Sequence, residues 1–320
     1  MPPTPVSSAP FLSVIIVSFN TRDMTLRCLQ SVQKSLETAD FASEILVVDN
    51  ASKDGSADAI RAQFPAVHVL ESHENLGFGR ANNLAMNAAR GQFFLLLNSD
   101  AFPIGDAISR LCAFLKSQPQ AAAAAPKILN EDGSLQRSVW DFPTPARSWF
   151  DNSGVGPLLR KLGFVRDFHA WNHDETREIP WAIGACLLVR REVFETLGGF
   201  DERFWMYAEE TDWQKVWRDA GWKILFFPDA QITHLGGGSG AGNSAVKAAF
   251  FDSYDLYLHK HHGKIGVFGA RAAMIFGLLL RLPLWFLMGA ARPKNPENRD
   301  KLRQSLALLK RHARAPKFGR

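Results

Sequence analysis

Acidic side chains stand at the ends of two strongly apolar segments of the chain. Asp100 closes the tripeptide Asn98–Asp100 after the run Phe93–Leu97, and Asp49 follows the run Glu44–Val48. Runs of this kind are typical of buried parallel strands, whose carboxyl ends form the ligand-binding edge of open α/β sheets. Two acidic strand ends on one sheet therefore indicate a site for a nucleotide and a metal ion.

A second acidic group lies later in the chain, where Glu209, Glu210 and Asp212 crowd the first turn of a predicted helix that ends near Gly221. The positive end of a helix dipole stabilises carboxylates, so N-terminal capping is an alternative role for each of them. Trp205 belongs to an aromatic segment just before them. This neighbourhood favours a role in a binding site over simple capping.

A histidine follows the predicted strand Lys223–Phe227 and precedes a glycine-rich loop that begins at Gly236. This residue, His234, is alone, and a single histidine is more often structural than a ligand. Here the glycines allow the backbone to approach phosphate oxygens closely, so we interpret His234 as a candidate ligand.

Strands and helices are predicted to alternate over the first 130 residues, and a further strand is predicted at Trp181–Val189. Alternation of this kind predicts a doubly wound, mainly parallel α/β sheet flanked by helices. Residues 138–180 are rich in aromatic residues, proline and glycine, and are expected to form an irregular insertion that faces the substrate. The predicted strands are Leu12–Ser18, Glu44–Asp49, Val67–Glu71, Gln92–Leu97 and Ala122–Ile128, and the predicted helices lie near Met24–Ser35, Ser56–Gln63, Arg80–Ala89 and Asp106–Gln118.

Composition describes a globular chain with an uneven charge distribution. The 320 residues, 46% of them hydrophobic, are enough for a large domain with a substantial core. The three cysteines show no spacing typical of a zinc site or a disulfide framework. Residues 258–320 contain 14 Lys and Arg against 2 Asp and Glu, whereas the rest of the chain contains 23 against 30. A basic arm on an acidic body indicates an anionic partner, either membrane phospholipid or nucleic acid.

Residues 267–291 are strongly apolar, but Arg271, Arg281 and Pro283 divide them into pieces shorter than the roughly 20 residues that a spanning helix needs. We therefore expect amphipathic helices in the membrane interface, with both arginines reaching lipid phosphates. A helical hairpin buried against the core is the alternative, although its arginines would need partners. The N-terminus lacks the pattern of a signal peptide, so the protein is expected to be peripheral at the cytoplasmic face of the plasma membrane.

The series of short motifs resembles the inverting family 2 glycosyltransferases of GT-A fold, in particular their rhamnosyltransferase-like branch, which builds bacterial cell-envelope polysaccharides. The resemblance extends over residues 12–262, and the common order of the motifs makes it specific. They are Val14–Asn20, Val47–Asn50 with Ser52, Asp54–Ser56, Asn75–Gly79 with Asn82 and Asn83, Leu97–Asp100, Gly184–Ala185, Phe200–Glu202, Glu209, Glu210, Asp212 and Gly221–Trp222.

The resemblance implies a nucleotide-sugar site at the strand ends. Ser18 and Asn20 would line the nucleotide pocket, and Asp49 would accept a hydrogen bond from the pyrimidine N3–H. The turn and helix start beside ribose and diphosphate, with free backbone donors, would comprise Asn75, Gly77, Gly79 and Asn82.

The resemblance also implies Mg²⁺ or Mn²⁺ at Asp100, with His234 as the candidate second ligand and the donor diphosphate supplying further oxygens. Asn98 stands where the family often has a first aspartate, a variant that the rhamnosyltransferase-like branch shares. Because an asparagine oxygen is neutral and a weaker ligand, the donor phosphates are expected to carry more of the metal binding.

The implied reaction is a single displacement at the anomeric carbon with inversion of configuration. Glu210, where the family commonly has aspartate, would take the proton from the acceptor hydroxyl. Asp100 with the metal, and His234, would stabilise the leaving nucleoside diphosphate. The supporting and acceptor-side residues would be Gly184, Trp205, Glu209 and Asp212.

The expected organisation is a disordered lead at residues 1–10, a nucleotide-sugar-binding half at 11–130, an acceptor-binding and catalytic half at 131–262 and a membrane-associating tail at 263–320. The predicted enzyme transfers a sugar, with dTDP-rhamnose as the leading donor, to a hydroxyl of a lipid-linked saccharide in cell-envelope polysaccharide synthesis.

Several alternatives stay open. A UDP-sugar-specific transferase and a polyprenyl-phosphate sugar synthase differ from the predicted enzyme only in substrate. A nucleotidyltransferase would need a basic, glycine-rich loop after the first strand, which residues 18–22 lack. A degenerate scaffold with a nucleic-acid-binding tail is the non-enzymatic alternative; since few aromatic residues follow Trp285, no nucleic acid partner is expected.

Overall fold

The computed structural model describes residues 9–164, 168, 171–236, 244–291 and 296–316. The chain divides into two compact units, Met1–Asp141 with Asn172–Ala249, and Phe142–Trp171 with Phe250–Arg320. These boundaries differ from those predicted at residues 130 and 262, because a segment from the middle of the chain groups with the C-terminal helices. Most of the predicted lead, residues 1–8, and residues 292–295 and 317–320 of the predicted tail lie outside the described residues.

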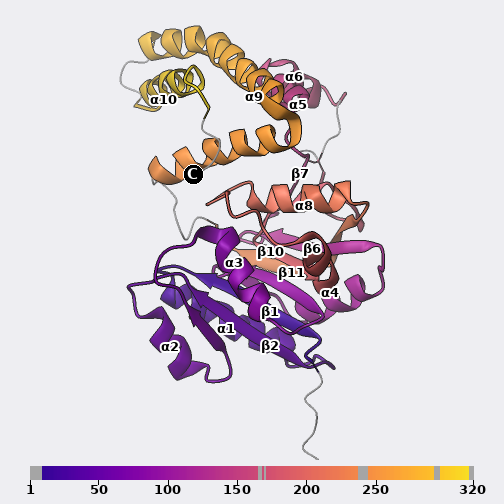
Figure 1. Ribbon diagram of the computed structural model, residues 1–320. Coiled ribbons are helices and arrows are strands. Elements are labelled where there is room, and N and C mark those ends of the chain that lie inside the picture. Colours follow the sequence, from indigo (N-terminus) through magenta and orange to yellow (C-terminus); the bar gives the residue numbers. More distant parts are fainter. Residues whose placement is uncertain (1–8, 165–167, 169–170, 237–243, 292–295, 317–320) are drawn as a thin grey trace, which may run out of the picture. The chain divides into compact units, whose positions relative to one another are not determined.

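The first unit is built on a mixed, mainly parallel sheet (Figure 1), as predicted. Its described strands follow the order β3-β2-β1-β4-β10-β6-β11-β5, and β8 pairs with β11. β1 to β4 are parallel to their neighbours in this group, and β6 is parallel to β11, whereas β10, β5 and β8 are antiparallel. The strands are β1 Leu12–Ser18, β2 Ser43–Asp49, β3 His68–Glu71, β4 Phe93–Asn98, β5 Ala101–Pro103, β6 Ala121–Leu129, β8 Arg177–Glu178, β10 Cys186–Arg190 and β11 Lys223–His234, with β7 Val139–Trp140 and β9 Trp181–Ala182 forming a separate pair.

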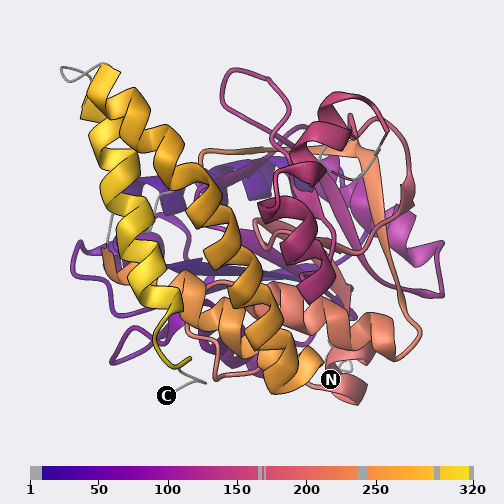
Figure 2. The ribbon, with the colours of Figure 1, turned by 90° about the horizontal axis from the view of Figure 1, so that it is seen from above.

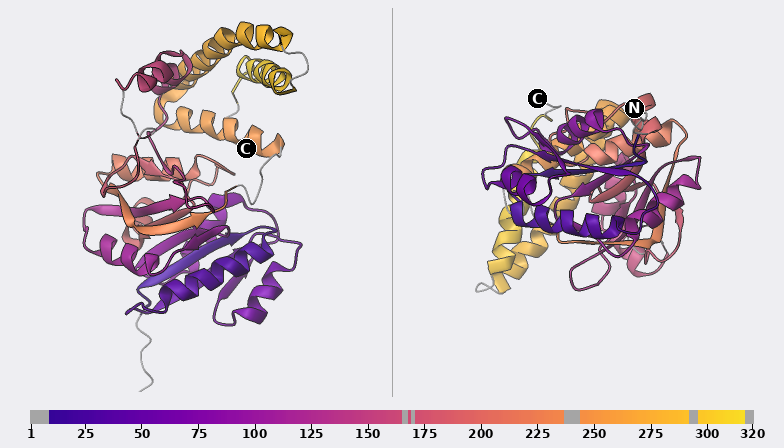
Figure 3. Two further views of the ribbon diagram at one scale, coloured as in Figure 1. Left: turned by 180° about the vertical axis from the view of Figure 1, so that it is seen from behind. Right: turned by 90° about the horizontal axis from the view of Figure 1, so that it is seen from below.

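Helices cover both faces of this sheet. α1 (Arg22–Leu36), α2 (Ser56–Gln63) and α4 (Ala107–Lys116) lie on one face, where Figure 3 shows α1 across the strands. α3 (Gly77–Ala88), α7 (Arg191–Leu197) and α8 (Glu209–Asp219) lie on the other. The central strands are therefore apolar on both sides, and each fully buried aliphatic side chain contributes about 1.5–3 kcal/mol.

The strand register aligns the polar residues that the sequence placed at strand ends. Ser18 at the end of β1 pairs with Asp49 of β2, and Val17 pairs with Asn98 of β4. The carboxyl ends of these three parallel strands thus share one edge of the sheet. The prediction that Asp49 and Asn98 lie at a common edge is confirmed.

The second unit is helical, and the prediction of an irregular insertion at residues 138–180 is wrong for its central part. α5 (Pro145–Asn152) and α6 (Val155–Lys161) form there. Thr144 caps α5 by accepting a hydrogen bond from the Arg147 N–H, and Pro145 occupies the first turn, where it costs no backbone bond. This Thr-Pro signal is visible in the sequence.

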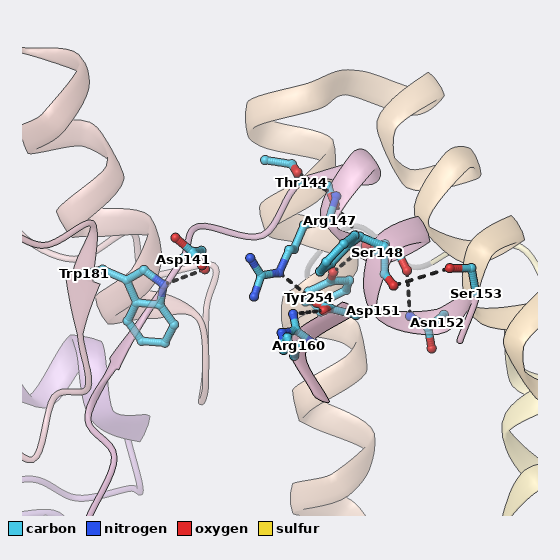
Figure 4. A network of polar contacts seen from close by, with 11 residues as sticks. Asp141, Thr144, Arg147, Ser148, Asp151, Asn152, Ser153, Arg160, Trp181 and Tyr254 are labelled. Carbon is cyan, nitrogen blue, oxygen red and sulfur yellow. Dashed lines mark hydrogen bonds and ion pairs between the residues drawn. The ribbon is translucent and has the colours of Figure 1, made fainter. Parts of the chain in front are cut away.

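Polar contacts hold α5 in the second unit, as Figure 4 shows. Arg147 Nε donates to Asp151 at 3.0 Å, and Arg160 also binds this carboxylate. The Ser148 and Tyr254 hydroxyls lie 2.8 Å apart, which ties α5 to α9 (Ser244–Ala291).

The apolar C-terminal segment is one continuous helix from Gly263, where α9 kinks with φ +67°, to residue 291. The prediction that Arg271, Arg281 and Pro283 divide it is wrong. Arg271 does not reach toward lipid: it is buried and pairs with Asp255 through Nε at 3.1 Å and Nη2 at 2.6 Å. These are the partners that a buried arginine requires.

Helix α10 (Pro296–His312) lies along the second half of α9 (Figure 2). Backbone carbonyls at its C-terminal end accept hydrogen bonds from Arg271.

Among the described residues, the helical segment Ala249–Met288 is long and apolar enough to cross a membrane. A buried helix of a soluble protein also meets this criterion.

Candidate active site

Loops after β1 and β2 are joined at the polar edge of the sheet. Asn20, with φ +52°, donates its N–H to Ser52 Oγ at 3.0 Å, and its side-chain oxygen accepts from the Lys53 N–H at 2.8 Å. Asp49 is buried, and its Oδ1 accepts from the Ser52 N–H at 2.7 Å. Asn20 and Asp49 therefore belong to one cluster, as predicted from the motifs.

Ser18 lies at this edge, but its side chain faces α1. It is completely buried, and its hydroxyl lies 3.2 Å from that of Thr21 and 2.9 Å from that of Thr25. Thr21 in turn donates to Ser99 Oγ at 3.0 Å. The contacts of the Ser18 side chain thus support the turn after β1, and its place in the nucleotide pocket stays a prediction.

The turn before α3 is held by Asn50, which sequence reasoning left without a role. Its side-chain oxygen accepts from the Leu76 N–H at 2.8 Å, and its amide donates to Asn75 Oδ1 at 3.0 Å. Asn75 Oδ1 also accepts from the Gly77 N–H at 2.9 Å. The adjacency of Asn50 to Asp49 in the strand-end motif was the available signal.

Glycines bring this turn against Trp205 and the start of α8. Gly77 has φ +79°, and a Cβ there would lie 2.2 Å from the Trp205 carbonyl oxygen. A Cβ on Gly79 would lie 3.7 Å from Glu209 Cβ, and one on Gly184 would lie 3.7 Å from Glu210 Cβ. The fold therefore gathers these predicted site residues into one place.

Asn82 is also part of this assembly. It is buried on α3 and donates to the Phe78 carbonyl at 2.9 Å. Its buried side-chain oxygen has no hydrogen-bond partner among the described residues. A buried acceptor of this kind is costly unless a ligand or water meets it, which fits its predicted place beside the donor.

The chain enters α8 through a strained turn. Tyr207 has φ +67° and Ala208 has φ +64°, in a region that residues with a side chain rarely adopt. Each such residue costs about 1–3 kcal/mol and persists only where the surroundings impose it. The strain places Glu209 and Glu210 at the first turn of the helix.

The two glutamates have different electrostatic environments. Burial raises the pKa of Glu209 well above its usual value, and the charge of Glu210 raises it further. Burial also raises the pKa of Glu210, while the N–H groups of Glu210, Gly184 and Thr211 stabilise its ionised form and oppose this shift. Glu210 is therefore the member of the pair whose ionised form receives backbone hydrogen bonds from more than its own residue. Its buried Oε2 has no hydrogen-bond partner among the described residues and can accept a proton.

Gln214 holds the backbone of Glu210 and was not predicted. It is completely buried, accepts from the Ala182 N–H at 2.9 Å, and donates to the carbonyls of Ala182 at 2.7 Å and Glu210 at 2.9 Å. Asp212 is buried on the same turn, where its N–H donates to the Ala208 carbonyl at 2.8 Å. Both residues thus fix the start of α8.

Asp100 and His234 meet at the other end of the site. β5 pairs antiparallel with β11, with Ala101 opposite His234, and Asp100 Oδ1 lies 3.3 Å from His234 Nε2. Both residues are buried, and the half-buried Asn98 lies two residues before Asp100. The described residues contain no group of three or more His, Cys, Asp and Glu suited to a metal. Two buried ligands fit a divalent cation that takes its remaining oxygens from phosphate.

Comparison with known proteins places this arrangement in a family. The model of Glycosyl transferase family 2 matches residues 13–198. The chain is 28% identical over 264 residues to the N-acetylglucosaminyl-diphospho-decaprenol L-rhamnosyltransferase of Mycobacterium tuberculosis, covering 78% of this chain and 85% of that protein. It is 30% identical over 233 residues to Glycosyltransferase AglE of Haloferax volcanii, covering 71% and 68%.

Solved structures share the fold. The mannosyltransferase PcManGT from Pyrobaculum calidifontis, in complex with GDP-Man and Mn²⁺, has a TM-score of 0.58 at 18% identity and covers 96% of this chain and 87% of its own. GalNAc-T7 with UDP, GalNAc and Mn²⁺ has a TM-score of 0.55 at 20% identity and covers 78% and 48%. The family match spans more than half of the chain, which is therefore an enzyme of glycosyltransferase family 2, in its rhamnosyltransferase-like branch.

Proposed function

We propose that this enzyme transfers rhamnose from dTDP-rhamnose to a hydroxyl of a lipid-linked saccharide, with inversion by a single displacement. The observation that carries the proposal is the Glu210 carboxylate, which is held by backbone N–H groups and keeps one buried oxygen without a partner among the described residues. The printed name of the Mycobacterium tuberculosis relative supports the choice of sugar and of a lipid-diphosphate acceptor.

In this reaction Glu210 takes the proton of the acceptor hydroxyl as the oxygen attacks the anomeric carbon. Glu209 lies beside this base, and burial together with the charge of Glu210 raises its pKa well above the usual value. Asp100 and His234 would hold Mg²⁺ or Mn²⁺, which when bound supplies positive charge to the leaving diphosphate. The turn at Asn75 and Gly77 would lie beside the same diphosphate, where the absence of a side chain on Gly77 permits a close approach.

Calorimetric titration with dTDP, UDP and GDP, each with and without Mn²⁺, tests the donor and the cation together. We expect Mn²⁺-dependent binding in which dTDP is preferred at least about tenfold, a difference of about 1.4 kcal/mol. Asp100→Ala should abolish the dependence on Mn²⁺, and Asp106→Ala, an exposed acid beyond β5, should leave it unchanged.

Other outcomes of this titration select other functions. A preference for UDP would favour the UDP-sugar alternative within the same enzyme class. Binding of no nucleotide would contradict the transferase site and favour a scaffold role. Transfer to polyprenyl phosphate itself, in place of a lipid-linked saccharide, would identify a polyprenyl-phosphate sugar synthase.

We also propose that the second unit holds the enzyme at an anionic membrane surface. Its helix α9 exposes several large apolar side chains after the kink at Gly263, and grouped apolar surface of this kind is typical of a face that contacts a membrane. After the kink at Gly263, the exposed large apolar residues among the described part of α9 are Ile265, Phe268, Phe276, Leu279, Leu280, Phe286 and Leu287. Arg271 is buried and is therefore not part of this exposed face of α9.

Co-sedimentation with vesicles of phosphatidylglycerol and phosphatidylcholine tests this location. Phe268→Glu with Phe286→Glu should lower the bound fraction at least about tenfold, because each phenylalanine contributes about 1.5–3 kcal/mol when buried in lipid. Ile104→Glu, an exposed apolar residue of the first unit, is the control. Equal binding by all variants would contradict the proposal, and resistance to alkaline carbonate extraction would make α9 a spanning helix.

A further inference from the structure

The residue of interest is Gln136, which follows the turn after β6 and was assigned no role from the sequence. Its backbone N–H donates to the Ile128 carbonyl at 2.9 Å, which fixes its place beside β6. Its carboxamide makes three contacts: Nε2 donates to Asn130 Oδ1 at 2.9 Å and to the His234 carbonyl at 3.0 Å, and Oε1 lies 2.6 Å from His234 Nδ1.

The orientation of this carboxamide follows from its partners. A backbone carbonyl only accepts hydrogen bonds, so the Gln136 atom that faces the His234 carbonyl must be the NH₂ group. The atom that faces His234 Nδ1 is therefore the carbonyl oxygen, which only accepts. His234 Nδ1 must then carry a proton and donate it to Gln136.

This hydrogen bond decides what the other ring nitrogen presents. In an uncharged imidazole only one nitrogen carries a proton, so a proton on Nδ1 leaves a lone pair on Nε2. His234 Nε2 lies 3.3 Å from Asp100 Oδ1, and both side chains are buried. Two electron-pair donors that face one another at this distance are suited to share one cation. The opposite tautomer would donate from Nε2 to Asp100 and could not bind a cation through Nε2.

We propose that Gln136 is a positioning residue that keeps His234 in the Nδ1–H tautomer, so that Nε2 and Asp100 together bind a divalent cation. Ligand histidines in proteins commonly donate their second ring N–H to a carbonyl or carboxylate, and loss of that acceptor typically lowers metal affinity about 10–100-fold. This inference rests on the cation of the proposed function. It adds a residue that contacts neither the cation nor the substrate.

Two measurements on the intact protein test it. Nitrogen-15 NMR of the uncharged His234 ring, at about pH 8.5, reports the tautomer directly without any metal. Calorimetry with Mn²⁺ alone reports the affinity. We expect Nδ1–H in the wild type, and in Gln136→Met, which keeps the length of the side chain, loss of this preference with about 10–100-fold weaker Mn²⁺ binding.

Two variants complete the design. Gln136→Glu retains an acceptor for the Nδ1–H and should bind Mn²⁺ more tightly than Gln136→Met, which a purely structural role would not produce. Gln231→Met changes an exposed glutamine on the same strand as His234 and should leave both measurements unchanged.

The inference is overturned by an Nε2–H tautomer in the wild type, or by equal Mn²⁺ affinity of the wild type and Gln136→Met. If the wild type binds no Mn²⁺ but still transfers sugar, the role in cation binding is overturned while the glycosyltransferase reaction stands. If sugar transfer is absent but Mn²⁺ binding follows Gln136 as expected, the inference is supported and the proposed reaction fails.

Discussion

Glu210→Gln is expected to lower kcat by about 10²–10⁴-fold, the range over which general bases contribute. The amide has the shape of the carboxyl group but cannot take a proton from the acceptor hydroxyl. Because the buried carboxylate of Glu210 is replaced by a neutral group, the fold should persist and the KM for the nucleotide sugar should change little. Steady-state transfer assays and thermal unfolding measure these three quantities.

The pH dependence of activity in the wild type should also show that Glu210 acts as the base. Burial raises the pKa of Glu210, and only the ionised form acts as a base. Activity therefore falls as the pH drops through this raised pKa, so the acidic limb lies above the usual glutamate value. Glu192→Gln, an exposed acid on α7, should preserve kcat and the limb. Full turnover by a folded Glu210→Gln enzyme would exclude Glu210 as the base.

Gly77→Ala is expected to destabilise the protein and to weaken nucleotide binding at least about tenfold. The φ of +79° costs an alanine about 1–2 kcal/mol. In addition, the new Cβ would lie 2.2 Å from the carbonyl oxygen of Trp205, which also accepts the Phe78 N–H at 3.3 Å. A backbone atom cannot rotate away, so overpacking should add about 1–3 kcal/mol by displacing the turn.

Gly133→Ala separates the conformational cost of a positive φ from the cost of the contact with Trp205. Gly133 has φ +80°, and a Cβ there would meet no atom within 4 Å. This variant should lose only the conformational part of the stability and should bind nucleotide as the wild type does. Denaturant unfolding and dTDP calorimetry on both variants provide the comparison. Equal losses of stability and affinity in the two variants would show that the contact between Gly77 and Trp205 is unimportant.

Strand-end residues could be predicted because their signals are local. An apolar run followed by a carboxylate indicates a buried parallel strand that ends at the ligand edge, and the observed register of Ser18, Asp49 and Asn98 agrees. Gly77 and Gly79 at the start of α3 were predicted as site residues from the resemblance to the family, and Gly77 adopts a conformation that other residues avoid.

The C-terminal helices show where local reasoning fails. Charged residues within an apolar segment suggested breaks, because no sequence pattern links Arg271 to Asp255 across the kink at Gly263. Their pairing removes the cost of a buried charge and lets the helix continue. For residues 142–171 the error had another cause, since the Thr-Pro capping signal was present but outweighed by composition.

The sequence by itself determined the family and the alternation of strands and helices over the first 130 residues, because these depend on neighbouring residues and on short motifs. Only the tertiary structure decided the environments of the two glutamates, since burial raises the pKa of both and the Gly184 N–H, from another loop, stabilises the ionised form of Glu210. It also decided the roles of Asn50, Gln214 and Gln136. Gln136 and His234 are separated by 98 residues, and their contact exists only because β6 and β11 pair in the sheet.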